Sequence, residues 1–299
     1  MEKKQKIVLG LATALLVLNF FCWREVFVLA EPAKLKVDFF SVGQGDSEFI
    51  ETPGGNKILI DGGPDSTVLE KLAENMPFWD RGLDLVVLTH PDSDHMNGLI
   101  DVLQKYRVDN ILWTGILRDG ADYQKWLKVL SAQQKSGAKI IFAKAGEEIS
   151  APCGPASGRK FVFLNILNPI SSLKGQYFKE DNDTGVVLRL IYGKESFLFS
   201  ADIDSKEEQK IVDAKTNLRA DVLKVAHHGS KYSSSNIFLA AVDPQIAVIS
   251  DGKNNQYHFP TSEVLQRLQN FGIKVLRTDT NGDVKIVSDG NSLKLLSNY

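Results

Sequence analysis

The most constraining feature of this sequence is a run of metal-ligand side chains directly after an apolar segment of strand length. Residues 85–89 read LVVLT, and residues 90–95 read HPDSDH. Two imidazoles and two carboxylates of this motif can serve as ligands of Zn²⁺ or Mn²⁺. Their alternation at positions 90, 92 and 94 lets them diverge toward two ions. The alternative is an ordinary helix start, with Asp92 or Ser93 as its cap.

Apolar segments of strand length alternate with segments of helical periodicity from residue 34 onward, which predicts an α/β fold. Continuous apolar strands are buried on both faces, so helices should cover both sides of the sheets. We therefore expect one domain, residues 31–299, built as a four-layer αββα sandwich. The helices are expected at 96–106, 122–135, 206–213, 235–242 and 262–271.

The N-terminus has the pattern of an export signal. Lys3, Lys4 and Lys6 precede an apolar stretch over residues 7–23. Basic residues stay on the cytoplasmic side, so the chain after the stretch is expected outside the cytoplasmic membrane. Residues 1–30 are thus predicted to be a membrane anchor, or a signal peptide cleaved near Ala30. The alternative is a buried core helix.

Composition narrows the kinds of site. Only two cysteines occur, and Cys22 lies in the apolar stretch, so zinc sites made of paired cysteines are excluded. Any metal must be held by His, Asp or Glu. The formal net charge of −2 does not attract nucleic acid through the overall field, so a nucleic-acid site would depend on local basic residues.

Three further segments carry side chains that could join the motif. Asp202 ends an expected strand and could bridge two metals, or it could be a strand-end turn residue. His227 and His228 follow another expected strand; we expect one to be a ligand and the other to face the substrate or support a ligand. His258 lies in a loop before a helix, where it could protonate a leaving group or bind phosphate. Surface histidines are the alternative.

Two glycine-containing turns are less specific. Residues 42–47 read VGQGDS, and Asp61 is followed by Gly62 and Gly63. Asp61 could orient a ligand histidine through a hydrogen bond. Both segments could equally be plain turns.

Together these motifs resemble the metallo-β-lactamase superfamily, whose signature is His-x-His-x-Asp-His after a buried strand. Asp92 stands here in place of the second histidine. That variant, the VGQGD turn, the segment 223–230 and the loop 257–260 are most similar to the hydrolase domain of ComEC-type DNA-uptake competence proteins. The resemblance covers residues 35–287 and implies the metallo-β-lactamase fold.

The resemblance also implies a site with two divalent metal ions, Zn or Mn. His90 and Asp92 would bind the first ion. Asp94, His95 and His227 would bind the second ion. Asp202 would bridge the two ions. The superfamily's third histidine of the first site is absent, so either Asn182 or Asp183 is expected to ligate in its place or the first site is expected to bind its ion weakly.

Metal-assisted hydrolysis is the implied chemistry. Asp94 would hold or receive the proton of the attacking water, and His258 or His228 would protonate the leaving oxygen. Lys224, Lys231 and Lys253 are either phosphate contacts or solvated lysines. The expected function is a phosphodiesterase or nuclease acting on DNA or another phosphodiester outside the membrane. A hydrolase of lactones, thioesters or β-lactams and a non-catalytic metal-stabilised binding module are the alternatives; the sequence indicates no protein partner.

Overall fold

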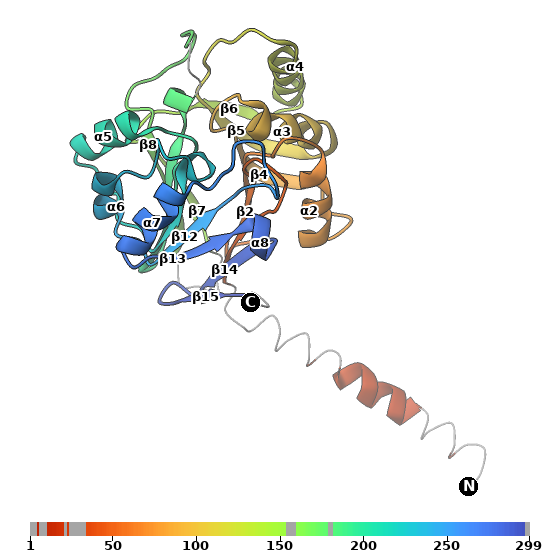
Figure 1. The fold of residues 1–299 in the computed structure, drawn as a ribbon. Coiled ribbons are helices and arrows are strands. Elements are labelled where there is room, and N and C mark those ends of the chain that lie inside the picture. The colour runs from red at the N-terminus through yellow and green to blue at the C-terminus, as the bar shows by residue number, and fades with distance from the viewer. Residues whose placement is uncertain are drawn as a thin grey trace.

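The computed structural model describes residues 5, 11–20, 23, 34–153, 160–178 and 182–296. Two sheets form its centre (Figure 1). The first has eight strands in the order β15-β14-β1-β2-β3-β4-β5-β6. Their bounds are β1 Leu35–Phe39, β2 Glu48–Glu51, β3 Lys57–Ile60, β4 Gly82–Val87, β5 Arg107–Trp113, β6 Lys139–Phe142, β14 Val284–Ser288 and β15 Leu293–Leu295.

The second sheet has seven strands in the order β13-β12-β11-β10-β9-β8-β7. Strands β3 to β6 run parallel in the first sheet, and β10 to β13 run parallel in the second. The bounds are β7 Glu148–Pro152, β8 Phe161–Asn168, β9 Val187–Tyr192, β10 Glu195–Phe199, β11 Val222–Lys224, β12 Ile246–Ile249 and β13 Lys274–Arg277.

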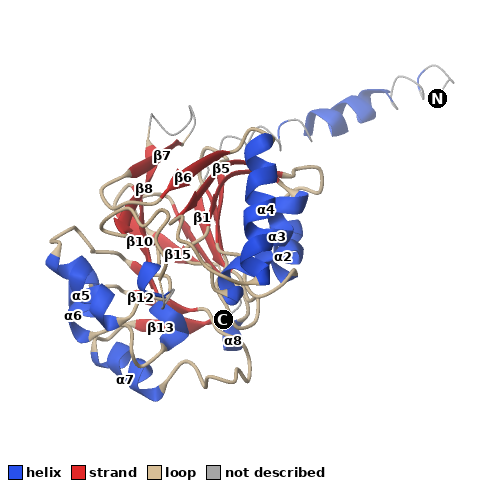
Figure 2. Ribbon diagram, turned by 90° about the horizontal axis from the view of Figure 1, so that it is seen from above, coloured by secondary structure: helices blue, strands red, loops and turns tan. Residues whose placement is uncertain are grey.

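Helices cover the outer face of each sheet, so the expected four-layer sandwich is confirmed (Figure 2). Side chains of β4 show why its sequence is continuously apolar. Leu85 and Val87 join the core between the sheets, whereas Leu83 and Val86 pack under the helices. The helices of the first half are α2 Thr67–Asn75, α3 Ser93–Lys105 and α4 Ala121–Lys135; those of the second are α5 Ser205–Asp213, α6 Asn236–Val242, α7 Ser262–Asn270 and the short α8 Thr278–Asn281.

The N-terminal segment is described only in part. Residues 11–20 form a helix with exposed side chains, Leu11 and Leu15 among them, and Figure 1 draws it apart from the sandwich. Within the described residues, no helix combines the length and the apolar character needed to cross a bilayer. The cleavage position near Ala30 and the boundary between residues 30 and 31 lie outside the described residues.

Several elements differ from the sequence-based expectations. Helix α3 begins at Ser93, three residues earlier than expected, because Asp92 already has the extended backbone of an N-cap residue. Helix α2 and strands β7, β13, β14 and β15 were not predicted. Strand β14 pairs with β1 across nearly the whole chain, and β13 extends the second sheet beside β12. Such long-range pairings are not visible in local sequence patterns.

Candidate metal centre

The carboxyl ends of the parallel strands bring the predicted side chains together. Asp61 follows β3 and His90 follows β4 in the first sheet, while Asp202 follows β10 in the second. His227 and His228 follow β11, in the short 3-10 turn η3 Ala226–Gly229. The carboxyl ends of parallel strands are where open α/β sheets gather ligands.

Hydrogen bonds to neighbouring side chains orient the rings of His95 and His90. His95 Nδ1 lies 2.8 Å from Asp61 Oδ2. Thr89 Oγ1 donates to the same carboxylate at 2.6 Å, so it accepts from His90 Nδ1 at 3.0 Å. In its neutral form each ring would therefore carry its proton on Nδ1 and present the lone pair of Nε2, as expected for a carboxylate-oriented metal ligand. Asp61 has the orienting role predicted for it.

His228 is oriented in the same way from the other sheet. Its Nδ1 lies 2.7 Å from the carbonyl oxygen of Ser250, to which it donates. Its Nε2 lies 3.3 Å from Asp94 Oδ2 and 3.3 Å from Asp202 Oδ2. Asp202 Oδ2 is also 3.4 Å from His95 Nε2. Two carboxylates and two imidazoles thus converge on one small volume.

The donor atoms of this group fit a divalent cation. Buried atoms without a hydrogen-bond partner in the described structure include Asp202 Oδ1 and the Nε2 atoms of His90, His95 and His228. Buried polar atoms are nearly always paired, so a set of unpaired imidazole nitrogens beside a carboxylate calls for an explanation. A metal ion bound by Nε2 and carboxylate oxygen would satisfy them.

His228, instead of His227, belongs to this group. The sequence-based assignment had placed His227 on the second ion and His228 near the leaving group. Both residues have left-handed backbones, with φ of 50° and 52°, and this turns His228 into the group. His227 points elsewhere: its ring lies beside Phe259, and its Nδ1 is 3.2 Å from the amide nitrogen of Asn182.

The ligands expected for a first ion are only partly assembled. His90 Nε2 lies 3.5 Å from Asp92 Oδ2. The other oxygen of Asp92 accepts a 2.7 Å hydrogen bond from Arg118, so Asp92 does not cap α3 with its side chain. Asn182 lies against His227, while Asp183 is exposed. Of the two residues expected to replace the missing histidine, Asn182 is therefore the one near the site.

The electrostatic field of the group favours a cation. Burial lowers the pKa of His95 and of His228, but nearby carboxylates, Asp202 first, outweigh burial and raise both pKa values well above the usual range. Burial raises the pKa of Asp94, yet the same two histidines bring it down to about 2. Asp202 also has its pKa lowered well below the usual range. The carboxylates are therefore ionised and available to a metal ion.

A buried ion pair between Lys224 and Asp46 contacts the side chains of the metal group. Lys224 Nζ contacts Asp46, and the two side chains are 1% and 2% exposed. The Asp46 carboxylate lies 3.3 Å from His228 Nδ1 and 3.8 Å from His95 Nδ1. Lys224 Nζ is also 3.8 Å from Asp202 Oδ1. Lys224 is thus neither a solvated lysine nor an exposed phosphate contact, which corrects both sequence-based interpretations.

His258 does not join the group. Its side chain is exposed on the loop between β12 and α7, and its backbone N–H donates to the carbonyl of Asn255 at 3.2 Å. The described residues form two carboxylate–histidine groups, and His258 belongs to neither. The second of these groups, Asp46 with Asp61 and His95, is the supporting layer beneath the first.

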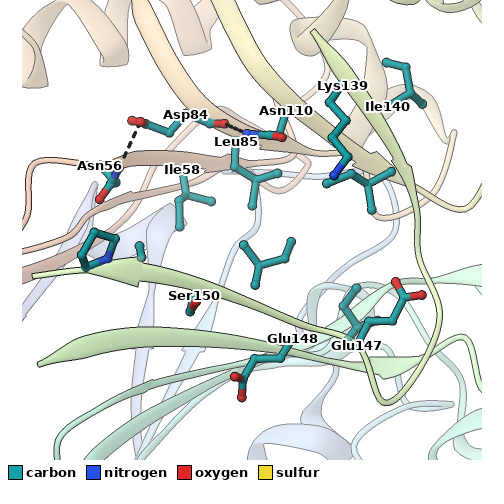
Figure 3. Close-up of a pocket in the computed structure, with 15 residues that line it drawn as sticks. Asn56, Ile58, Asp84, Leu85, Asn110, Lys139, Ile140, Glu147, Glu148 and Ser150 are labelled. Atoms are coloured by element: carbon teal, nitrogen blue, oxygen red, sulfur yellow. Dashed lines mark hydrogen bonds between the residues drawn. The ribbon is translucent and has the colours of Figure 1, made fainter.

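A separate cavity of about 680 Å³ lies between the sheets, near the amino ends of β3, β4 and β5 (Figure 3). Its lining includes the apolar side chains of Ile58, Leu85 and Ile166 and the acidic side chains of Asp84 and Glu148. None of the predicted site residues lines it. Because size without convergent ligands does not make a reactive centre, the metal group remains the candidate functional site.

Comparison with known proteins identifies the family. The family model described as "Metallo-beta-lactamase superfamily" matches residues 41–250. The chain belongs to the metallo-β-lactamase superfamily. That range holds both halves of the metal group, from Asp46 to Ser250. The match and the group of ligands together make this chain a metal-dependent hydrolase of that fold.

Curated relatives and solved structures refine the placement. The chain is 33% identical over 267 residues to "ComE operon protein 3" of Bacillus subtilis, covering 84% of this chain and 32% of the relative. It is 30% identical over 272 residues to "Competence protein ComA" of Neisseria gonorrhoeae, covering 90% of this chain and 34% of that one. The chain thus spans about a third of the length of these relatives. The metallo hydrolase Igni18 of Ignicoccus hospitalis shares the fold, with a TM-score of 0.52 and 16% identity over 84% of this chain and 98% of that chain.

Three residues around the site were not assigned these roles from the sequence. Asp46 was part of an unspecific turn, Lys224 was treated as exposed, and Arg118 was not considered. Lys224 carried a usable signal, because it stands between Leu223 and Val225 in an apolar strand. A lysine in a strand buried on both faces needs a carboxylate partner. Arg118 follows β5 by several residues and carries no comparable signal.

Proposed function

We propose that this chain is a phosphodiesterase or nuclease that acts on DNA outside the cytoplasmic membrane. The observation that supports it most is the convergence of Asp94, His95, Asp202 and His228, with their ligand atoms within 4.8 Å of one another. Metal groups rich in carboxylates suit phosphodiester hydrolysis, because bound Zn²⁺ or Mn²⁺ stabilises charge on phosphoryl oxygens and activates water. The competence relatives favour DNA over other phosphodiesters.

In this proposal His228 takes the ligand role expected for His227. Asp94, His95 and His228 would hold the second ion, and Asp202 would bridge to a first ion beside His90 and Asp92. Asp94 has a side chain that is 28% exposed, whereas that of Asp202 is 4% exposed. Water can therefore reach Asp94, which suits it to accept the proton of the attacking water.

The extracytoplasmic location rests on the N-terminal sequence. Lys3, Lys4 and Lys6 ahead of an apolar stretch favour a chain that leaves the cytoplasm, held by residues 1–30 or released by cleavage. Fusion of a reporter enzyme to the C-terminus, active only outside the cytoplasm, tests this. Reporter activity in intact cells is expected; activity confined to the cytoplasm would contradict the location.

The test of the activity is a cleavage assay on single- and double-stranded DNA with added Mn²⁺ or Zn²⁺, beside lactone, thioester and β-lactam substrates. Asp202→Asn should abolish cleavage and lower the bound metal measured by mass spectrometry. Asp109→Asn, an exposed aspartate in β5, is the matched control and should change neither. Hydrolysis of the other esters without DNA cleavage would replace the proposal with that activity. A metal-loaded chain inert to every substrate would indicate a binding module.

A further inference from the structure

An aromatic stack stands beside the metal group. The rings of Tyr257 and Phe259 are stacked, with 5.6 Å between centroids and 19° between planes. The edge of His227 meets Phe259 with a centroid distance of 5.6 Å. His227 is in turn the chain neighbour of His228, a member of the group. A continuous path of rings therefore leads from the metal group to the surface.

The outermost ring of this path is open to solvent. Tyr257 is 55% exposed, although its inner face is covered by Phe259. Its outer face is thus available for a flat partner.

The loop that carries the stack is held rigidly. The side chain of Asn255 donates to the carbonyls of Gly252 and Phe259, and its oxygen accepts from the N–H of Phe259. Thr261 donates through its backbone and its hydroxyl to the carbonyl of Gly229, one residue after His228. The loop is therefore fastened to the same turn that presents the histidine to the metal group.

The same turn and loop are packed without spare room. A side-chain carbon added at Gly229 would lie 2.5 Å from Pro260 Cβ. The position of the rings relative to His228 is thus fixed by backbone contact. Because the loop is already ordered, binding a partner would cost little further conformational entropy in the loop.

We propose that Tyr257, backed by Phe259, stacks against a nucleobase of single-stranded nucleic acid whose backbone enters the metal group. This rests on the proposed phosphodiesterase function and adds the substrate class. A ring stacked from behind offers a flat face to any base, so recognition would not depend on sequence. Bases within a duplex are already stacked on their neighbours, and the platform therefore selects unpaired strands or frayed ends.

The experiment measures binding of a fluorescent oligothymidylate of about ten nucleotides and of an abasic strand of equal length, in the presence of Mn²⁺ and with cleavage prevented by phosphorothioate linkages. Tyr257→Ala should raise the Kd for the oligothymidylate about 5- to 150-fold, the loss expected for one stacked base. Tyr257→Phe should keep wild-type affinity, because the ring is retained. The abasic strand should bind wild type and Tyr257→Ala equally.

The outcomes separate this inference from the function on which it rests. Equal oligothymidylate binding by Tyr257→Ala and wild type, with DNA cleavage intact, would overturn the platform alone. An equal loss for the abasic strand would also overturn it, since the contact would then be to the backbone. Binding of anionic phospholipid vesicles that depends on Tyr257, without oligonucleotide binding, would assign the ring to a membrane surface and reject the nucleobase. Wild type that cleaves no phosphodiester would overturn the proposed function itself.

Discussion

Replacing Lys224 with methionine should destabilise the protein strongly. The Lys224 and Asp46 side chains are 1% and 2% exposed, so water does not screen the charge that remains. Although burial lowers the pKa of Lys224, Asp46 and Asp202 raise it above its usual range, and the lysine is charged. Breaking a buried ion pair by removing one partner costs about 3–5 kcal/mol. That is a large part of a typical stability of about 5–15 kcal/mol.

Urea unfolding in the presence of a chelator is the assay, so that bound ions do not contribute to stability. The double variant Lys224→Met with Asp46→Asn should recover about 0.5–3 kcal/mol relative to Lys224→Met, because it removes the unpaired charge as well. Lys36→Met is the matched control: its pair with Glu51 is exposed and should contribute less than about 1 kcal/mol. A Lys224→Met loss no larger than that of the control, or no recovery in the double variant, would refute the reasoning.

Three other predictions follow from the structure. Gly98→Ala should lower the urea midpoint of unfolding and weaken Mn²⁺ binding, although alanine has the better helix propensity. The new Cβ would lie 1.9 Å from the carbonyl oxygen of Gly62, the residue next to Asp61, so the backbone must shift. An unchanged midpoint and an unchanged Mn²⁺ affinity would contradict this packing. Burial raises the pKa of Asp38 from 3.8 to about 6, so ionisation of this carboxyl destabilises the folded state as the pH rises through that interval. Asp38→Asn should therefore raise the free energy of unfolding by at most about 3 kcal/mol at pH 8 and by almost nothing at pH 4. An equal gain at both pH values would contradict this prediction. His258 is exposed and belongs to neither carboxylate–histidine group, so His258→Ala should leave the amount of bound metal unchanged, whereas loss of metal would make His258 a ligand.

The sandwich and most of its metal group could be predicted because both depend on local patterns. His90, Asp94 and His95 follow an apolar strand directly, and the end of a parallel strand is where ligands gather. Asp202 is a weaker case, since an aspartate at a strand end is most often a turn residue. It became a candidate only together with the others.

What could not be predicted depends on backbone geometry and on contacts between distant segments. The choice between His227 and His228 is set by two successive left-handed residues, a backbone conformation that is uncommon for any residue other than glycine. The pairing of Lys224 with Asp46 joins residues 178 positions apart. Strand β14 is not visible in the local sequence pattern, because it lies between β1, at the opposite end of the chain, and β15.

The central claim is that His95, His228 and Asp202 hold a catalytic metal ion. Crystals grown with Mn²⁺ and measured at an X-ray energy where manganese scatters anomalously test it directly. We expect an anomalous peak about 2.0–2.2 Å from both Nε2 atoms and from an Asp202 oxygen. A second peak between Asp202 and His90 would show the two-ion form. A peak bound by His227 in place of His228, or no peak in this group at saturating Mn²⁺, would contradict the account.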